Sequence, residues 1–425
     1  MTQAVSATGA EGDVQLPARG LNRLLTTRWR IALAWVLTRA LTVSIFLPHF
    51  PGKISVNDLH YYAQQLGHLT HGGTLATTMP EYPLPMIAIT MPQFLLGGTN
   101  PHAFAVLYVG SLLALDGGLL LALVRRSSYA GHPAITFWVW CLPAIGSLTY
   151  LRFDLIPSIL VGLALLCATH GRGARAGAFT AFGAVLKLWP GALVPVFLLR
   201  RGERKGVVFG FVATLVGIVL VCWAIGGWTR LISPVKWQDG RGLQVESVPA
   251  APLMFLRSLN HRTWYAMPTR WQATEIFGPG VRTVISLTTV LMLAGALYLL
   301  WLWVRAYRHG RNDPVFVGWL LLTAILIVII TNKTFSPQYL LWLAGPVLAM
   351  LWNNPDDPAT RRVAIGVIAA GLVTQLEFPD WYYPLTHTTP LTFAATTALL
   401  VRDGIILWLT WVAARQTHQH LTSTR

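Results

Sequence analysis

Acidic side chains are scarce in this sequence, and one of them lies where an apolar run gives way to polar residues. The chain of 425 residues has 16 Asp and Glu residues against 32 Lys and Arg residues. Asp58 follows the first long apolar run, within NDLHYYAQQ (57–65), and His60 and Tyr62 are close to it. A carboxylate there can remove a proton from a substrate hydroxyl, and the rings can stack on or hydrogen-bond to a polar ligand. In a simpler interpretation, Asp58 only caps the helix that LHYYAQQL would form.

Lysines beside apolar segments are the second chemical feature. Lys187 lies between two leucines in GAVLKLWPG, and Lys333 follows an apolar run in TNKTFSPQYLLW. An ammonium group at membrane depth is costly unless it reaches water or an anion, so such a lysine is a candidate ligand of an anionic substrate. Snorkelling to the membrane surface is the alternative interpretation.

Other polar residues are candidates for contact with a substrate. Glu81 and Tyr82 stand in MPEYPLP, whose prolines also suit an ordinary helix start. Arg152 and Asp154 stand in TYLRFDLIP, and in the alternative interpretation they form only an ion pair at a helix end. The remaining candidates are Arg241, His261, Arg262 and Gln338. Several cations with few acids indicate a ligand that carries phosphate.

The elements that position these residues are transmembrane helices. Hydrophobic residues make up 54% of the chain and charged residues 11%, and the mean hydropathy is +0.53. Apolar runs of about 17–25 residues recur, which is the length that crosses about 30 Å of hydrocarbon. The net charge of +16 arises mostly from Lys and Arg in short loops. This pattern indicates membrane topology and contact with anionic lipid heads, and it does not indicate nucleic-acid binding.

The distribution of arginines predicts how the chain crosses the membrane. Arginines before the first apolar run place the N-terminus in the cytoplasm, and the same rule predicts a cytoplasmic C-terminus. Residues 84–98, with Pro85 and Pro92, are predicted to form a helix on the outer leaflet. Two short helices are predicted to meet at 186–191, where Pro190 breaks the run. The twelve predicted spans are 31–49, 102–124, 131–148, 153–169, 176–188, 189–200, 206–226, 281–305, 314–332, 337–354, 362–376 and 392–413.

The predicted organisation is a single all-α membrane domain. A disordered cytoplasmic tail over 1–30 precedes this domain at 31–413, and a cytoplasmic tail over 414–425 follows it. Its outward loops are predicted at 50–101, 227–280, 332–338 and 377–391. The acidic residues expected outside or at the outer rim are Asp58, Glu81, Asp154, Asp239, Glu246, Glu275, Glu377 and Asp380.

Several residues are expected to be structural. Arg39 and Asp116 fall within predicted spans and are expected to pair, as are Arg402 and Asp403. The cysteines, Cys141, Cys167 and Cys222, have no metal-ligand spacing and are expected in the core. The tryptophans near span ends are expected in the interfacial belt, although some can also stack on sugars; they are Trp223, Trp228, Trp237 and Trp381.

The ordered set of motifs resembles a known enzyme family. The sequence has no GxxxxGK[ST], no GxGxxG after a strand and no DxD, so a nucleotide-bound donor is not expected. Taken in order, VNDLHYYAQQL, EYPLPMIA, RFDLIPSILVGLALL, GAVLKLWPGALVPVFLL, GRGLQVES and NKTFSPQYLLWLAGPVLA resemble glycosyltransferases of the GT-C type, specifically the polyprenol-phosphate-sugar dependent enzymes of family 87 in actinobacteria. The resemblance covers about residues 31–413, although YPLP stands where many relatives have Tyr-Pro-Pro.

The resemblance implies a reaction and a set of roles. Asp58 matches the first-loop aspartate of the family and would be the general base, while Lys187 and Lys333 match positions near the donor pocket and Arg152 would join them on the phosphate. A second carboxylate, if one is needed, would be Asp154 or Glu81. The reaction would invert the anomeric carbon without a metal or cofactor, because the lipid-phosphate-sugar is a substrate.

The expected partners follow from this reaction. They are a polyprenyl-phosphate-sugar donor, most simply carrying mannose, an acceptor that is a glycolipid or envelope glycan, and the membrane lipids, with no nucleic acid. The chain is expected to act as a monomer in the plasma membrane, with its site on the extracytoplasmic face. A translocator of lipid-linked saccharide is the alternative function, since many transporters also have twelve spans.

Overall fold

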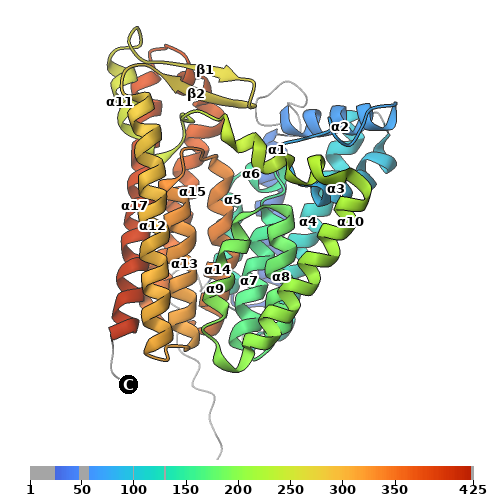
Figure 1. Cartoon of the computed structure of the whole chain (residues 1–425), viewed down its shortest axis with the longest axis vertical. Coiled ribbons are helices and arrows are strands. Elements are labelled where there is room, and N and C mark those ends of the chain that lie inside the picture. Colours follow the sequence, from blue (N-terminus) through green and yellow to red (C-terminus); the bar gives the residue numbers. More distant parts are fainter. Residues whose placement is uncertain (1–23, 47–56, 99, 129–130, 423–425) are drawn as a thin grey trace, which may run out of the picture.

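The computed structural model describes residues 24–46, 57–98, 100–128 and 131–422. Most of the predicted N-terminal tail over 1–30 therefore lies outside the described residues, as does the beginning of the first outward loop. Within these residues the fold is helical, apart from one short β-hairpin. The hairpin defines one end of the molecule, called the hairpin end below, and it lies at the top of Figure 1.

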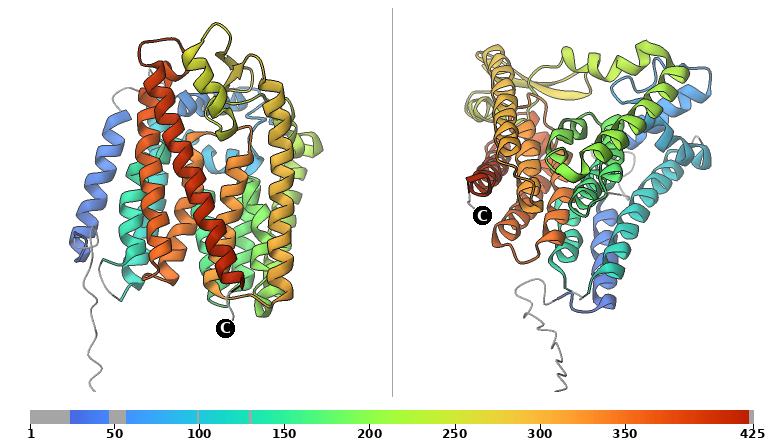
Figure 2. Two further views of the ribbon diagram at one scale, coloured as in Figure 1. Left: turned by 90° about the vertical axis from the view of Figure 1, so that its left-hand side faces the viewer. Right: turned by 60° about the horizontal axis from the view of Figure 1, so that its bottom comes forward.

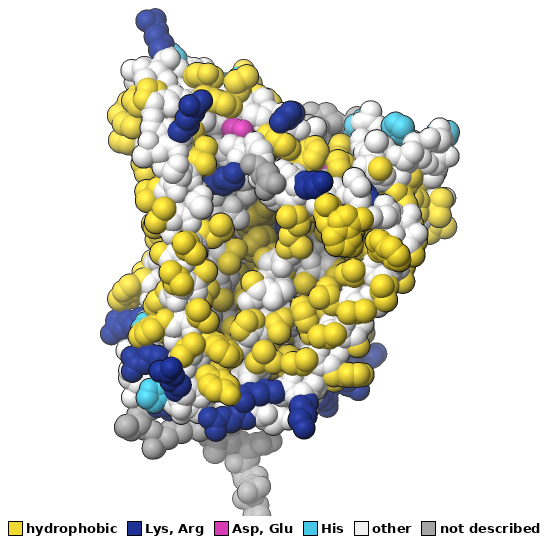
Figure 3. Space-filling model, viewed as in Figure 1, with side chains coloured by type: hydrophobic (Ala, Val, Ile, Leu, Met, Phe, Trp, Pro, Cys, Tyr) yellow, Lys and Arg dark blue, Asp and Glu magenta, His cyan; other side chains and the backbone are white. Residues whose placement is uncertain are grey.

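Six described helices are long and apolar enough to cross a membrane. They are α4 (Pro101–Arg126), α10 (Arg204–Asp239), α12 (Val281–Arg308), α13 (Pro314–Thr331), α15 (Pro358–Gln375) and α17 (Thr392–Thr422). Most of α13 is buried, whereas α10 and α12 expose most of their apolar side chains. Figure 3 shows an apolar band between two groups of basic residues, as expected for a protein that spans a membrane.

Further helices complete the bundle. The first of them, α1 (Arg28–Phe46), runs toward the hairpin end, and it begins in the half of the molecule in which α17 ends (Figure 2). The others are α5 (Pro133–Ile145), α6 (Leu148–Leu151), α7 (Leu155–Thr169), α8 (Gly173–Leu186), α9 (Val194–Phe197), α14 (Leu341–Asn353) and α16 (Tyr382–Thr386). The chain is thus an all-α polytopic membrane protein, as predicted, and the number of twelve crossings stays a prediction.

Helix starts follow ordinary capping chemistry. Asn100, Asp313 and Asp357 accept hydrogen bonds from the first backbone N–H groups of α4, α13 and α15, and each is followed by proline. The missing N–H of proline costs nothing at this position, so the sequence itself specifies where these helices begin. The last helix, α17, continues to Thr422 and so includes most of the predicted C-terminal tail at 414–425.

Glycines let the helices of the bundle approach closely. A Cβ on Gly210 of α10 would lie 1.9 Å from the carbonyl oxygen of Ala174 in α8, and a Cβ on Gly177 would lie 2.1 Å from that of Val207. A Cβ on Gly345 of α14 would lie 1.9 Å from the carbonyl oxygen of Ser158 in α7. Small residues at helix contacts are typical of membrane bundles, where close packing replaces the hydrophobic effect between helices.

The predicted break near Lys187 is confirmed, but the second short helix is not. The first helix, α8, ends at Leu186, and Lys187 is extended. The returning segment is a 3₁₀ turn, η4 (Trp189–Leu193), followed by the single turn α9. The prediction of a span at 189–200 is therefore wrong in its secondary structure, because Pro190 and the following Gly191 allow only tight turns there.

The hairpin end contains more regular structure than the sequence indicated. The predicted helix at 84–98 is present as α3 (Leu84–Gly97), and α2 (Asn57–Thr70) runs across the bundle (Figure 1). The predicted loop over 227–280 is in fact mostly folded. It contains the end of α10 beyond a kink at Gly227, α11 (Ala251–Leu259), and the antiparallel strands β1 (Tyr265–Thr269) and β2 (Ala273–Phe277).

Tight turns connect these elements. They are η5 (Arg201–Glu203) before α10, η6 (Val248–Ala250) before α11, η7 (Pro337–Leu340) before α14, and the π-type segment η8 (Leu376–Asp380) after α15. The outward loops predicted at 332–338 and 377–391 thus carry η7, η8 and α16. Both loops lead into the walls of one cavity.

Buried ion pairs tie the bundle together as predicted. Arg39 of α1 donates to both carboxylate oxygens of Asp116 in α4, at 2.9 and 3.3 Å. Asp116 also accepts from Trp35, Trp138 and Tyr150, so its charge is fully satisfied inside the protein. Arg402 pairs with Asp403 at 2.7 Å. Intramembrane charges of this kind are tolerated only when they are paired and hydrogen-bonded.

Candidate active site

A cavity of about 930 Å³ lies at the hairpin end and brings distant parts of the sequence together. Part of its wall comes from the first half of the chain, namely α2, the segment before α3, the residues after α6 and the break after α8. The rest comes from the end of α10, the β-hairpin, α12, α13 and the segment before α14. Figure 3 shows that the molecule is hollowed on this face. The predicted residues that line the cavity are Asp58, Glu81, Tyr82, Arg152, Lys187, Arg241, Lys333 and Gln338.

Asp58 lines the cavity and pairs with Arg152. It lies in the first turn of α2, while Arg152 follows α6. Their side chains are 23% and 21% exposed, so the pair faces the cavity and is not sealed in the core. Burial raises the pKa of the Asp58 carboxyl, and the Arg152 charge opposes this rise. Asp58 is therefore a stronger base than an exposed aspartate, which suits the removal of a proton from a hydroxyl.

Replacing Arg152 with glutamine should shift the pH dependence of activity. Without the guanidinium, the remaining effects are burial and the nearby negative charge of Asp154, and both raise the pKa of Asp58, so this pKa should rise further. Since a base acts only when ionised, the acidic limb of the kcat/KM profile for the expected sugar transfer should move to higher pH. Measuring that profile between pH 4.5 and 8 for wild type and Arg152→Gln tests this. An unchanged acidic limb, with only a uniform loss of rate, would show that Arg152 does not act on the base.

Lys187 is held by one carboxylate and a set of aromatic rings. Its Nζ donates to Asp154 Oδ1 at 2.5 Å, and Trp342 Nε1 donates to the same oxygen at 2.7 Å. The ammonium lies 4.5 Å from the centre of the Tyr339 ring and 5.4 Å from that of Phe153. Because Asp154 is almost fully buried, Lys187 is the member of this pair that reaches the cavity. The alternative interpretation, in which Arg152 and Asp154 form an ion pair with each other, does not hold, since each of them pairs across the fold.

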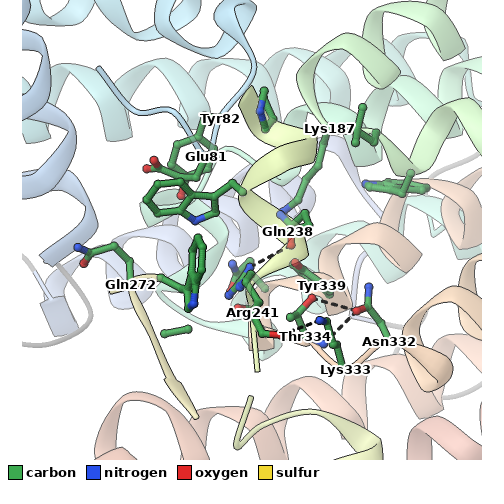
Figure 4. A pocket seen from close by; sticks show the side chains of 18 of the residues that line it. Glu81, Tyr82, Lys187, Gln238, Arg241, Gln272, Asn332, Lys333, Thr334 and Tyr339 are labelled. Carbon is green, nitrogen blue, oxygen red and sulfur yellow. Dashed lines mark hydrogen bonds between the residues drawn. The ribbon is translucent and has the colours of Figure 1, made fainter. Parts of the chain in front are cut away.

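Lys333 lies on another wall and is fixed through the backbone. Its Nζ donates to the carbonyl oxygen of Arg241 at 2.6 Å, and its own carbonyl oxygen accepts from the N–H of Gln244 at 3.1 Å. Figure 4 shows Lys333, Asn332, Thr334 and Arg241 gathered on one side of the cavity. These groups present positive charge and hydrogen-bond donors, as a phosphate requires.

Glu81 and Tyr82 reach the cavity from the segment before α3. Tyr61 Oη donates to Glu81 Oε1 at 2.6 Å, while Glu81 Oε2 is buried and has no hydrogen-bond partner among the described residues. Burial raises the pKa of Glu81, and the hydrogen bond from Tyr61 opposes this rise. The Tyr82 hydroxyl contacts that of Tyr62 at 3.2 Å. A buried carboxylate oxygen without a partner is uncommon, and since the residue lines the cavity, Glu81 stays a candidate contact for a substrate hydroxyl.

Arg230 holds this segment in place, although sequence analysis did not single it out. This residue of α10 is buried and donates to the backbone carbonyl oxygens of Leu75, Met79 and Tyr82 at 2.9 to 3.2 Å. Met79 has a φ of +45°, which is unusual for a residue other than glycine. Arg230 therefore ties the kinked end of α10 to the turn that presents Glu81 and Tyr82.

A buried acidic cluster beside the cavity was also missed. Arg402 donates to Glu377 Oε1 at 2.8 Å and to the carbonyl oxygen of Glu246 at 2.5 Å, in addition to its bond with Asp403. The Glu246 carboxylate accepts from Gln244, which also donates to Ser336 in the cavity wall. Glu246 and Glu377 were expected outside or at the outer rim, and which side of the membrane they lie on stays a prediction. Both side chains are buried, Glu377 against Arg402 and Glu246 against Gln244.

Glu246 should make the stability of the protein depend on pH. Burial raises its pKa to about 7, against the opposing effects of Gln244 and Arg402, from an ordinary value of 4.5. The folded state therefore binds this proton more tightly than the unfolded chain does, so stability falls as pH rises from about 4.5 to about 7. Glu246→Gln carries no charge, and its Tm relative to wild type should rise between pH 5 and pH 8 in thermal-shift measurements. Asp356→Asn, at an exposed carboxylate, is the control and should show no such trend. A difference in Tm that is the same at both pH values would contradict the assignment.

Several predicted site residues do not line the cavity. His60, His261 and Arg262 are exposed elsewhere at the hairpin end, and Tyr62 and Asp154 lie behind the wall, where they support Tyr82 and Lys187. The signal for these residues was position near a predicted helix end or, for His261 and Arg262, in a predicted outward loop, and position alone does not tell which way a side chain faces. The lining residues that sequence analysis did not put forward as site residues include Tyr61, Trp237, Gln238, Trp271, Gln272 and Asn332.

Comparison with known proteins supplies an independent finding. The family model described as glycosyltransferase family 87 matches residues 81–337. This range contains Arg152, Lys187, Arg241 and Lys333, whereas Asp58 lies before it. No curated protein matches the sequence.

Proposed function

Because the chain belongs to glycosyltransferase family 87, we propose that it transfers a sugar from a polyprenyl-phosphate donor to a hydroxyl group of a lipid-linked or envelope glycan. The protein is an integral membrane glycosyltransferase. Mannose is the first sugar to test and arabinose the second. The transfer inverts the anomeric carbon, needs no metal, and takes place in the cavity at the hairpin end, which faces the extracytoplasmic side.

One observation carries this proposal. A single cavity collects the Asp58 carboxylate and the cations Arg152, Lys187 and Lys333, from segments that are far apart in the sequence. Such a set has the two parts that an inverting transfer with a phosphate leaving group requires. One part is a base for the incoming hydroxyl, and the other is fixed positive charge for the departing oxygen.

The reaction can be followed through the residues. Asp58 accepts the proton of the acceptor hydroxyl while that oxygen attacks the anomeric carbon, so a C–O bond to the acceptor forms. The bond from the anomeric carbon to the phosphate oxygen breaks, and the lipid phosphate leaves with the electron pair. Lys187 and Lys333 stabilise the growing negative charge, and because both are already held in place they pay little reorganisation cost during the step.

The cavity also has a side that suits a lipid tail. Thr288 and Met292 of α12, Val328 of α13, and Leu188 after α8 line it. Leu188 is exposed, and α12 is exposed over most of its length. In a bilayer these surfaces meet acyl chains, so a polyprenyl tail can lie along them while its phosphate reaches Lys187.

A transfer assay with the full chain tests the proposal. Purified protein in lipid nanodiscs is incubated with radiolabelled polyprenyl-phosphate-mannose, or the arabinose analogue, and a membrane lipid extract as the acceptor pool. We expect label to enter the acceptor fraction with release of one polyprenyl phosphate per sugar moved. If label instead crosses the bilayer of proteoliposomes with the donor intact, the protein is a translocator and the proposal is wrong.

A further inference from the structure

We infer that the roof of the cavity, formed by Trp237 and Trp271, is the subsite that recognises a sugar ring of the acceptor. The inference rests on the proposed function and narrows it, because it requires the acceptor to be a carbohydrate. Both tryptophans line the cavity, Trp237 from the end of α10 and Trp271 from the turn of the β-hairpin.

The two indoles form an ordered aromatic surface. Their ring centres are 5.1 Å apart, and the ring planes are perpendicular. The guanidinium of Arg270 lies 4.5 Å from the centre of the Trp271 ring. An aromatic face suits the C–H groups on one side of a sugar ring, whereas an interfacial belt residue faces lipid. Trp228 of the same α10 shows the belt pattern, since it is 64% exposed and does not line the cavity.

Hydrogen-bonding groups surround the indoles. Gln238, Arg241, Thr269 and Gln272 also line this part of the cavity. Figure 4 shows Gln272 and Glu81 on the side of the cavity away from Asn332 and Lys333. Aromatic faces with amide and carboxylate groups beside them are suited to the faces and hydroxyl groups of a sugar. The cationic side is thus left to the phosphate of the donor.

Two backbone positions next to the indoles, Gly240 and Gln272, are under unusual constraints. Gly240 has ordinary dihedral angles (φ −91°, ψ 0°), yet a Cβ there would lie 2.2 Å from Trp271 Cζ2. The glycine is therefore required by the indole and not by the backbone. Gln272 has a φ of +55°, a position in a three-residue hairpin turn where glycine is the usual residue. A positive φ is unfavourable for a residue that has a side chain, yet Gln272 stands here and its side chain is exposed.

The hairpin is also locked to the end of α10. The N–H of Gly242 donates to Glu275 Oε1 at 2.8 Å, and a Cβ on Gly242 would lie 2.5 Å from Glu275 Oε2. Lys333 Nζ also binds the carbonyl oxygen of Arg241, the residue before Gly242. The short segment after α10 therefore connects the two indoles to the cationic side of the cavity. A sugar bound on the indoles is thereby held at a defined position relative to the phosphate-binding cations.

Binding and transfer can be measured separately. Octyl α-mannopyranoside and octyl β-glucopyranoside, below their micelle concentrations, are the sugar probes, and tetraethylene glycol monooctyl ether is the control with the same tail and a free hydroxyl. In saturation-transfer NMR with protein in nanodiscs, we expect signal on the ring protons of at least one glycoside, lost in Trp271→Ala and Trp237→Ala and kept in Trp228→Ala. In the transfer assay, these two cavity variants should raise the KM for the glycan acceptor about three- to tenfold and leave the KM for the donor unchanged.

Two further variants separate a role in recognition from a role in folding. Gly240→Ala keeps both indoles but displaces one, and it should raise the acceptor KM as Trp271→Ala does. Gln272→Gly should raise the Tm, because it relieves the turn, and still raise the acceptor KM. The inference is overturned if no octyl glycoside shows a saturation-transfer signal, or if the octyl ether gives as strong a signal as the glycosides. It is also overturned if Trp237→Ala and Trp271→Ala leave the KM for the acceptor unchanged. Retained glycoside binding without any transfer by wild type would overturn the proposed function and leave the subsite standing.

Discussion

Asp58→Asn should lower kcat for sugar transfer by about 10²- to 10⁴-fold, which is the contribution expected of a general base. Asparagine has nearly the same shape and can still accept a hydrogen bond from Arg152, but it cannot take the proton of the acceptor hydroxyl. The KM for the polyprenyl-phosphate donor should change little, because Lys187 and Lys333 remain in place. Initial rates at saturating donor, with equal amounts of purified protein in nanodiscs, measure the effect.

Controls for this variant come from the molecule itself. Asp356→Asn removes an exposed carboxylate at a surface pair with Arg361 and should leave kcat unchanged. The Tm of Asp58→Asn should stay close to that of wild type, since a partly exposed ion pair contributes at most about 1 kcal/mol. If Asp58→Asn retains full activity, another group is the base, and Glu81 would be the next residue to replace because it is a carboxylate that also lines the cavity.

Arg402→Met should destabilise the protein by about 3–5 kcal/mol, the cost of removing one partner from a buried ionic cluster. Arg402 is fully buried and neutralises Glu377 and Asp403, and it also holds the backbone of Glu246. Methionine fills a similar volume but leaves both carboxylates without a cation. A large fall in Tm, and in the yield of folded protein on size-exclusion chromatography, is the expected result.

The matched comparison is Arg361→Met. Arg361 also pairs with an acidic residue, but this pair is exposed and should contribute about 0–1 kcal/mol. The triple variant Arg402→Met/Glu377→Gln/Asp403→Asn should recover part of the stability, because no unpaired charge stays buried. A fall in Tm equal to that of Arg361→Met would show that the cluster does not stabilise the fold.

The sequence by itself determined the features that depend on local composition. Apolar runs of sufficient length predicted a helical membrane protein, and Pro190 together with Lys187 predicted the break after α8. The pairing of Arg39 with Asp116 was also predicted, because a charge within the membrane requires a partner and few were available. Short ordered motifs were enough to indicate the enzyme family, which the family model confirms.

Only the tertiary structure decided which side chains meet. Spacing suggested that Arg152 pairs with Asp154, but the packing of α2 against the residues after α6 gives Arg152 to Asp58, and the return of the chain after α8 gives Asp154 to Lys187. The sequence likewise did not indicate that the Glu377 side chain is buried and paired with Arg402. The physical reason is that helix formation depends on neighbours within a few turns, whereas the partner of a charge depends on how distant helices pack and which way each side chain faces.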